Sequence, residues 1–194
     1  MKLAAKTVFS AVLLILSVII TAVGINILYK AMYPTEYEDL VVKYSRLNDL
    51  EPTLVFAVIR CESGFDKDAM SHKDAHGLMQ LTPETLEWLV MVEGGSELPD
   101  MYDPEQNIKY GTALLKLHLD EFGNYREMLA AYHAGRGAVN TWLKDPQYSA
   151  DGKTLDKIPY GDTNNYVNKV LNVKKTYNKL FSKKYNSFKL PSDV

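Results

Sequence analysis

Glu62 is the residue of this chain whose surroundings most clearly favour acid chemistry. It follows an apolar segment, residues 54–61, and is followed at once by Ser63 and Gly64. A carboxyl group at the end of a hydrophobic helix loses hydration, which disfavours its ionised form and raises its pKa towards neutrality. Such a group can donate a proton at physiological pH, as cleavage of a glycosidic bond requires. The same spacing also fits a surface glutamate beside a turn.

The other reactive side chains argue against several classes of site. Cys61 is the only cysteine, so no disulfide forms within the chain and metal sites with several cysteines are excluded. Its apolar neighbours predict a protonated, inert thiol rather than a nucleophile. The four histidines lack the His-Glu-x-x-His spacing of zinc hydrolases, so we expect no metal and no cofactor. A net charge of −2 does not suggest a nucleic-acid partner.

The segments that would position Glu62 have helical periodicity, and the predicted fold class is all-α. A helix is expected from Pro34-Thr35, with a capping box formed by Thr35 and Glu38. A second helix runs from Pro52 to a stop at Gly64 and places Glu62 in its last turn. Residues 65–77 and 145–162 are predicted loops. Further helices are expected from Thr82-Pro83, from Asp103-Pro104, around residues 127–133 and 138–144, and from Thr163 onward.

An apolar segment without charged residues, Val8 to Leu28, precedes these helices and is long enough to span a bilayer. It is either a cleaved signal peptide or a retained membrane anchor, and its length and poor cleavage site favour the anchor. Lys2 and Lys6 predict a cytoplasmic N-terminal tail and an extracytoplasmic domain on a single-pass cell-membrane protein. We therefore expect a tail and transmembrane helix over residues 1–33, a catalytic domain over 34–182, and a basic C-terminal tail over 183–194.

Four motif blocks follow one another along the domain. They are Glu62-Ser63, then Ser71-x-x-x-Ala75-x-Gly77-Leu78-Met79-Gln80-Leu81-x-Pro83-x-Thr85, then Asn107-Ile108-x-x-Gly111, then Ala130-Ala131-Tyr132-x-Ala134-Gly135. This ordered set, within a similarity that runs from about Tyr37 to Tyr177, resembles the soluble lytic transglycosylase (SLT) domain, a lysozyme-like domain of glycoside hydrolase family 23. The resemblance implies a bacterial, compact helical domain whose groove binds glycan strands of peptidoglycan.

The resemblance also implies roles for individual residues. The family's single catalytic acid maps onto Glu62, and its substrate-binding serine, glutamine and tyrosine map onto Ser71, Gln80 and Tyr132. Met79 either supplies a dry wall of the groove or packs in the core. Two further substrate-binding candidates depart from the family pattern: His133 stands in place of an asparagine, and Asp162 in place of a glutamate. Asp162 is equally well explained as a helix cap beside Thr163.

The activity implied is non-hydrolytic. Glu62 would protonate the β-1,4 bridging oxygen between N-acetylmuramic acid (MurNAc) and N-acetylglucosamine (GlcNAc), and the muramyl 6-hydroxyl would then form a 1,6-anhydro end, in cell-wall remodelling. A hydrolytic, goose-lysozyme-like enzyme with Asp66, Asp68 or Asp74 as second carboxylate is an alternative. Another is a catalytically weak or silent peptidoglycan-binding scaffold. Expected partners are glycan strands, the membrane through the N-terminal helix, and cell-envelope assembly proteins.

Overall fold

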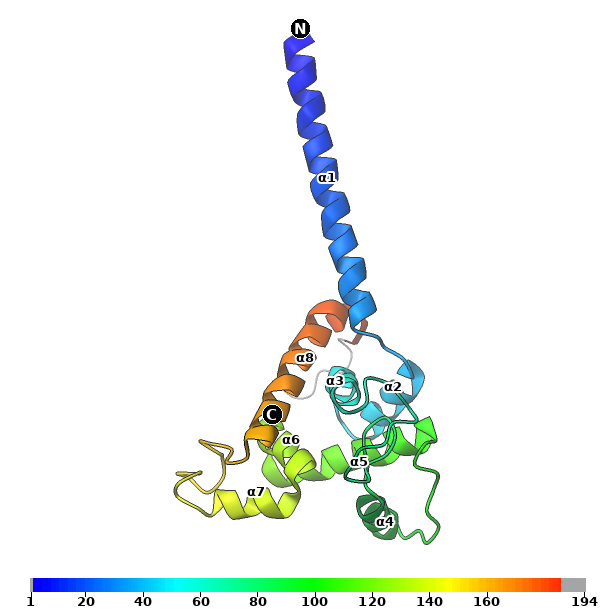
Figure 1. Ribbon diagram of the computed structural model, residues 1–194, viewed down its shortest axis with the longest axis vertical. Coiled ribbons are helices and arrows are strands. Elements are labelled where there is room, and N and C mark those ends of the chain that lie inside the picture. The colour runs from blue at the N-terminus through cyan, green and yellow to red at the C-terminus, as the bar shows by residue number, and fades with distance from the viewer. Residues whose placement is uncertain (1, 186–194) are drawn as a thin grey trace. The chain divides into compact units, whose positions relative to one another are not determined.

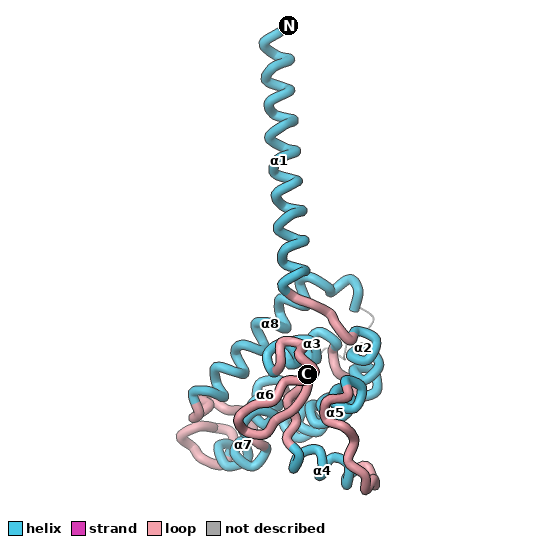
Figure 2. Tube along the Cα trace, turned by 45° about the vertical axis from the view of Figure 1, so that its right-hand side comes forward, coloured by secondary structure: helices cyan, strands magenta, loops and turns pink. Residues whose placement is uncertain are grey.

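The computed structural model describes residues 2–185, and the regular structure in this range is helical. Two isolated bridges, Met70 to His76 and His76 to Leu81, are the β-type pairings within it. The chain divides into two compact units, Met1–Thr35 and Glu36–Val194. Figure 2 shows the helices of the second unit joined by loops. The helices are α1 (Lys2–Met32), α2 (Glu38–Leu47), α3 (Pro52–Glu62), α4 (Pro83–Val92), α5 (Pro104–Phe122), α6 (Tyr125–Ala134), α7 (Arg136–Leu143) and α8 (Gly161–Tyr185).

The first unit consists of α1 and the residues that follow it. Within this uninterrupted helix, Val12–Met32 has 21 residues and a mean hydropathy of 2.5. None of this stretch is buried against protein, and its length and composition suffice to cross a membrane, as those of a signal sequence near the N-terminus also would. The helix therefore overlaps the predicted span, Val8 to Leu28.

The second unit is built around α3, which α8 packs against (Figure 1). Residues 52–59 of α3 are all buried, in keeping with a helix that is apolar all round. The Phe56 ring stacks on that of Tyr177 from α8, with ring centroids 5.6 Å apart. Burial of this helix on all sides fixes the position of its last residue, Glu62.

A polar cluster fastens the start of α3 to α6 and α8. Lys174 donates a 2.8 Å hydrogen bond to Glu51, and the Tyr125 hydroxyl donates a 3.0 Å bond to the same carboxylate. Burial raises the pKa of Glu51, but the bonds from Lys174 and Tyr125 outweigh it and hold the pKa below its usual value. The Lys174 ammonium also lies 4.8 Å from the centre of the Tyr125 ring. The start of α3 is thus held by α6 and α8.

The predicted helix starts at Thr82-Pro83 and Asp103-Pro104 are confirmed by their caps. Thr82 and Asp103 each accept a hydrogen bond from a main-chain amide in the first turn of α4 and α5. Asn124 does the same for α6, which begins at Tyr125, two residues before the helix predicted around residues 127–133. The capping box of Thr35 and Glu38 is wrong. Tyr37 is the residue before α2 and has a left-handed backbone with φ of 56°, which interrupts the helical geometry that Thr35 would need.

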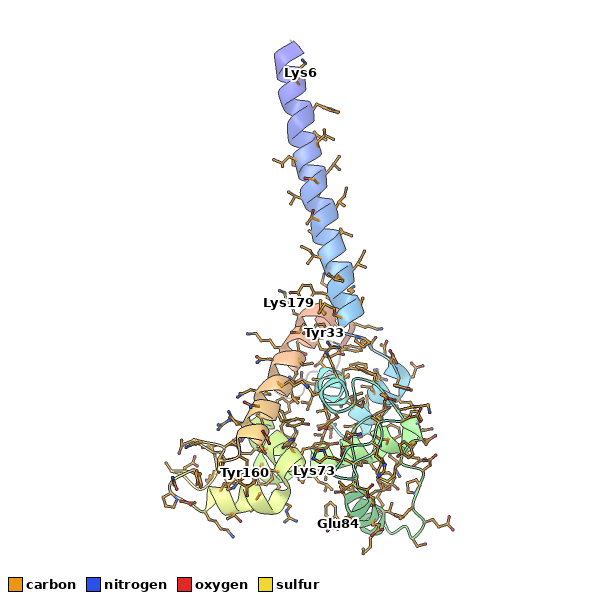
Figure 3. The ribbon with its side chains drawn as sticks, in the orientation of Figure 1. Lys6, Tyr33, Lys73, Glu84, Tyr160 and Lys179 are labelled. Atoms are coloured by element: carbon orange, nitrogen blue, oxygen red, sulfur yellow. The ribbon has the colours of Figure 1, made fainter. Side chains whose placement is uncertain are left out.

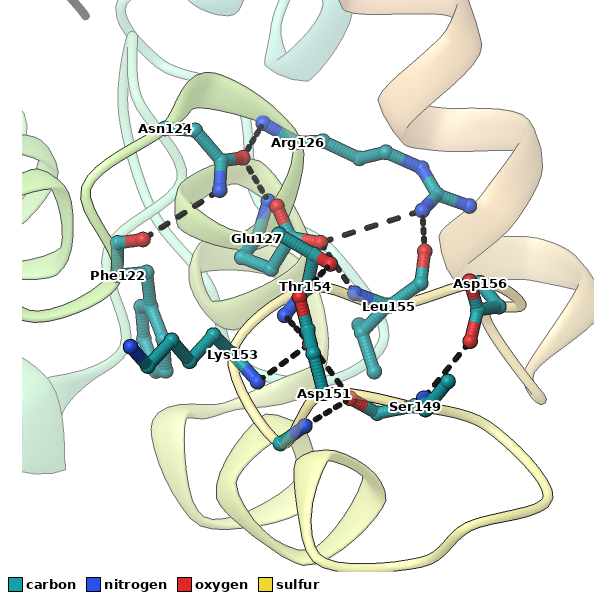
Figure 4. Close-up of polar contacts among 12 residues, drawn as sticks. Phe122, Asn124, Arg126, Glu127, Ser149, Asp151, Lys153, Thr154, Leu155 and Asp156 are labelled. Carbon is teal, nitrogen blue, oxygen red and sulfur yellow. Dashed lines mark hydrogen bonds and ion pairs between the residues drawn. The ribbon is translucent and has the colours of Figure 1, made fainter.

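The loop between α7 and α8 is fastened to the first turn of α6 (Figure 4). The buried Glu127 carboxylate accepts a 2.7 Å hydrogen bond from the Leu155 amide, and Arg126 donates to the Leu155 carbonyl. Asp151 accepts hydrogen bonds from the amides of Lys153 and Thr154. This predicted loop is therefore ordered by polar contacts within itself and with α6. The predicted C-terminal tail starts within α8, and its residues 186–194 lie outside the described residues.

Candidate active site

Glu62 is the last residue of α3 and is half-buried. Loss of hydration raises the pKa of its carboxyl group to about 7, against opposing effects of the Tyr166 hydroxyl and the Lys169 ammonium. The carbonyl end of a helix also disfavours an anion there. This carboxyl group therefore carries a proton in a large share of molecules at neutral pH and can release it.

Two tyrosine side chains share the surroundings of Glu62. Burial raises the pKa of both Tyr132 and Tyr166 well above the usual value, and a charge on Glu62 raises each further. The buried Tyr166 hydroxyl has no hydrogen bond of standard geometry to any described residue, although it is close enough to Glu62 to favour the carboxylate. Tyr166 is not among the site residues predicted from the sequence, since periodicity cannot reveal which group a buried hydroxyl faces.

Ser63 connects the end of α3 to the loop that follows it. Its Oγ donates a 2.9 Å hydrogen bond to the carbonyl of Leu78 and accepts a 3.1 Å bond from the amide of Phe65. The serine after the acid thus brings the Gly77-Leu78-Met79-Gln80 segment against Glu62. The motif contained this pair, but its structural role was not predicted.

Asn107, from the first turn of α5, holds the same segment from the other side. It is 2% exposed. Its Oδ1 accepts a 2.7 Å bond from the Met79 amide, and its Nδ2 donates to the carbonyls of His76 at 3.0 Å and Met101 at 2.8 Å. One side-chain amide thus bonds to three main-chain groups of the residues around it. This explains the third motif block, for which no role was predicted.

Met79 fills the space between this loop and α5. Its side chain is fully buried, and a Cβ at Gly111 would collide with it. Met79 has no exposed surface to offer a sugar, so the core-packing alternative describes its side chain. Its carbonyl oxygen accepts a 2.7 Å hydrogen bond from the Tyr132 hydroxyl, which links α6 to the loop.

Ser71 and Gln80 shape the loop by bonds to its own backbone. Ser71 Oγ accepts hydrogen bonds from the amides of Lys73 and Ala75 at 3.2 and 3.1 Å. Gln80 has a left-handed backbone with φ of 51°, and its Nε2 donates to the carbonyls of Ala69 and Gly77. Both side chains remain partly exposed around these bonds.

Asp74 has the left-handed backbone that a glycine would accept, with φ of 58°. Its carboxylate lies 2.8 Å from His76 Nε2, and the other ring nitrogen of His76 lies 2.7 Å from the Tyr102 hydroxyl. The exposed carboxylate of Asp74 is thus paired within the loop. The groups that act on the Glu62 pKa are Tyr166 and Lys169, and no carboxylate of the described residues is among them.

His133 and Asp162 line a polar cleft of about 550 Å³ together with Lys73, Tyr160 and Thr163. Figure 3 labels Lys73 and Tyr160 at this cleft. The His133 ring stacks on Tyr166 with centroids 4.6 Å apart, and its Nδ1 lies 3.1 Å from Thr163 Oγ1. Burial and Lys73 lower the pKa of His133, while Asp162 raises it. The stacked ring joins this cleft to the surroundings of Glu62.

Comparison with known proteins decides the family. The model of the Transglycosylase SLT domain family matches residues 39–155. The chain belongs to this family. The matched region contains Glu62, the fastened loop, Asn107 and Tyr132, and α8 with Tyr166 follows it.

The SLT domain of this chain is similar to domains of larger proteins. It is 35% identical over 147 residues to a soluble lytic murein transglycosylase of Salmonella typhimurium, a match that covers 72% of this chain and 22% of the relative. It is 29% identical over 170 residues to a membrane-bound lytic murein transglycosylase C of Actinobacillus pleuropneumoniae, covering 73% and 46%. The chain thus spans about a fifth of the soluble relative and about half of the membrane-bound one.

Solved structures agree with the all-α, lysozyme-like fold. The 70 kDa soluble lytic transglycosylase of Escherichia coli superposes with a TM-score of 0.68 at 29% identity, covering 83% of this chain and 27% of that one. An inactive mutant of the lytic transglycosylase Slt of Pseudomonas aeruginosa gives a TM-score of 0.67 at 30% identity, covering 77% and 25%. The predicted SLT-type fold is confirmed.

Proposed function

We propose that this protein is a peptidoglycan lytic transglycosylase that cleaves the MurNAc-GlcNAc β-1,4 bond without water. The observation that carries the proposal is the Glu62 carboxyl group, half-buried at the end of an apolar helix with its pKa raised to about 7. An acid with that pKa is matched to giving and retaking a proton near neutral pH. The names of the relatives, lytic murein transglycosylases, support the same substrate class.

In the proposed reaction Glu62 is first the acid and then the base. It protonates the bridging oxygen as the bond from that oxygen to the muramyl anomeric carbon breaks. The resulting carboxylate removes the proton of the muramyl 6-hydroxyl, whose oxygen forms the new bond to the anomeric carbon. Glu62 ends protonated, as it began, and the product is a 1,6-anhydromuramyl end. Attack from within the same sugar can contribute roughly 7 to 11 kcal/mol through proximity, so a second carboxylate is dispensable.

The remaining site residues are assigned to orienting Glu62 or to binding the substrate. Tyr132 and Tyr166 lie around the proton donor and orient it. Ser71 and Gln80 present their free hydrogen-bonding capacity on the loop beside it. His133 and Asp162 line the adjoining polar cleft, where they are available to the charged and polar groups of a glycan strand and its substituents. The buried Met79 side chain packs between this loop and α5 and so supports the loop.

We further propose that α1 anchors the protein as a single-pass membrane protein with the SLT domain outside the cytoplasm. The length and hydropathy of Val12–Met32 support membrane association, and Lys2 and Lys6 support a cytoplasmic N-terminus. Protease added to spheroplasts should digest the SLT domain while a cytoplasmic marker survives. Protection of the domain until the membrane is permeabilised would contradict this orientation.

The decisive experiment is product analysis of purified peptidoglycan by mass spectrometry. The wild type should release muropeptides with 1,6-anhydromuramyl ends, and Glu62→Gln should release none while keeping its circular dichroism spectrum. Glu97→Gln, at an exposed loop position, is the matched control and should behave as wild type. Hydrated reducing ends would indicate a hydrolase, and absence of any product from the wild type would indicate a binding protein.

A further inference from the structure

Helix α8 carries a row of lysines. Lys175, Lys179 and Lys183 are exposed and follow one another at intervals of four residues. They therefore form one row, about 12 Å long, along the helix. From Thr163 to Tyr185 the sequence contains no acidic residue. The lysine row thus carries positive charge that no carboxylate of its own helix offsets.

The packing of α8 sets the direction in which the lysine row faces. Tyr177 is fully buried, and its ring stacks on Phe56 of α3. Two residues correspond to about 200° around an α-helix, so Lys175 and Lys179 point away from the side on which Tyr177 packs. Figure 3 labels Lys179 on this helix. The lysine row therefore faces outward from the SLT domain.

Two other lysines of α8 are used inside the domain. Lys174 lies 2.8 Å from a carboxylate oxygen of Glu51, and Lys184 lies 2.6 Å from one of Glu38. For the lysine row, no ion pair with another of the described side chains is found. The three ammonium groups of the row are therefore available to an anionic partner outside the domain.

The end of the lysine row is joined to the segment that follows the apolar helix α1. Lys184, next to Lys183, donates a hydrogen bond to Glu38, the first residue of α2. Glu38 comes six residues after Met32, the last residue of α1, and six residues span at most roughly 22 Å. Tyr29, near the end of α1, is a residue type enriched where membrane meets water. With α1 in the membrane, the end of the row stays within that reach of the lipid headgroups.

We propose that the lysine row binds anionic headgroups of the membrane in which α1 is anchored, so that α8 lies along the bilayer surface. The proposal rests on the proposed anchoring by α1 and adds an orientation of the domain to it. Basic residues beside a membrane are attracted to anionic lipids within about one Debye length, roughly 8 Å at physiological salt. Because α3 packs on the other side of α8, this contact turns α3 and Glu62 away from the bilayer.

The test uses the full chain inserted through α1 into lipid nanodiscs, made either of phosphatidylcholine alone or with about one third phosphatidylglycerol. Brief treatment with an amine-reactive acetylating reagent, followed by peptide mass spectrometry, gives a modification rate for each lysine. Phosphatidylglycerol should lower the rates across the lysine row about threefold or more. Salt at about 1 M, which shortens the Debye length to about 3 Å, should restore them. Lys144 and Lys153 are exposed lysines outside α8, and their rates should be equal in both lipids.

A double variant shows whether the lysine row acts as one site. In Lys175→Gln with Lys183→Gln, Lys179 is the remaining lysine of the row, and phosphatidylglycerol should protect it less than half as well as in the wild type. Lys144→Gln with Lys153→Gln is the matched control, because it removes the same charge outside α8 and should leave Lys179 fully protected. Equal modification of the row in both lipids would overturn the proposal, and so would equal protection of Lys179 in the two double variants.

A soluble polyanion distinguishes a membrane from a polymer as the partner. Polyphosphate is added to the protein in nanodiscs of phosphatidylcholine alone. If polyphosphate protects the lysine row and phosphatidylglycerol does not, the row binds an anionic polymer and the proposal is wrong.

Failure of this inference is separable from failure of the anchor and of the transglycosylase function. If the chain enters the nanodiscs and the lysine row is modified equally in both lipids, the anchor stands and the headgroup contact is wrong. If the chain does not enter the nanodiscs, the anchor and this inference are both wrong. Release of anhydromuropeptides from purified peptidoglycan is measured separately and depends on neither result.

Discussion

The Tyr132 hydroxyl donates a 2.7 Å hydrogen bond to the main-chain carbonyl of Met79, and this bond joins α6 to the loop beside Glu62. The same loop is tied to α3 by Ser63 and to α5 by Asn107. Three helices thus set the position of a segment that has almost no regular structure of its own. The loop keeps its shape because its main-chain groups are bonded from three sides.

Removal of the Tyr132 hydroxyl should loosen this arrangement. In Tyr132→Phe the Met79 carbonyl loses its partner in a partly buried place, so the free energy of unfolding should fall by about 1 to 2 kcal/mol. The rate of peptidoglycan cleavage should fall as well, because the ring also borders Glu62. Urea denaturation measures the first effect and product release the second. The control is Tyr160→Phe, because Tyr160 is an exposed residue, with 58% of its surface accessible. This variant should have the same free energy of unfolding as the wild type.

Gly77 should tolerate alanine poorly. Its φ is 73°, and a Cβ there would collide with the Asn107 side chain and the Met101 carbonyl. Backbone strain and displacement of Asn107 together should lower the free energy of unfolding by about 2 to 4 kcal/mol. Gly123 has the same kind of backbone, with φ of 74°, but open space around it. Gly123→Ala should therefore lose only about 1 kcal/mol, and equal losses for both variants would refute the role given to Asn107.

The raised pKa of Glu62 has a consequence for stability. Between the ordinary value of 4.5 and the folded value of about 7, the folded protein holds a proton that the unfolded chain has released. Stability contributed by the protonated carboxyl group is therefore lost as pH rises through this window. Glu62→Gln removes that loss, so it should be more stable than wild type at pH 8, by up to about 3 kcal/mol, and nearly equal to it at pH 4. Denaturation at both pH values measures the difference; a variant less stable at pH 8 would contradict the burial of this group.

The rate of cleavage should depend on the protonated form of Glu62. Above the pKa of about 7 the rate constant should fall about tenfold for each pH unit, because the acid has lost its proton. Lys169 lowers this pKa from α8, so Lys169→Met should move the falling limb to higher pH. Lys175→Met, at another exposed position of α8, is the control. If the falling limb of the pH–rate profile does not move in Lys169→Met, a group other than Glu62 is responsible for that limb.

The sequence predicted the helices well because their ends carry their own chemical signals. Pro52, Pro83 and Pro104 each begin a helix, and Gly123 ends one, as local stereochemistry requires. The capping box at Thr35 failed because the backbone of Tyr37 is left-handed there, a conformation that no local pattern demanded.

The candidate site was predictable only in part, for a similar reason. Glu62 could be placed because an apolar segment leads directly to it. Asn107 bonds to the Met79 amide 28 positions away, and Tyr166 reaches Glu62 from α8. Neither pairing leaves a periodic trace in the sequence.

The three-sided fastening of the loop by Ser63, Asn107 and Tyr132 also bears on how fast a strand docks. A surface that is already ordered before binding loses little conformational entropy when a ligand binds. Ordering the protein therefore offsets less of the binding free energy. Encounter then proceeds without a slow rearrangement of the protein, and complex lifetime rather than arrival rate sets the affinity differences among substrates.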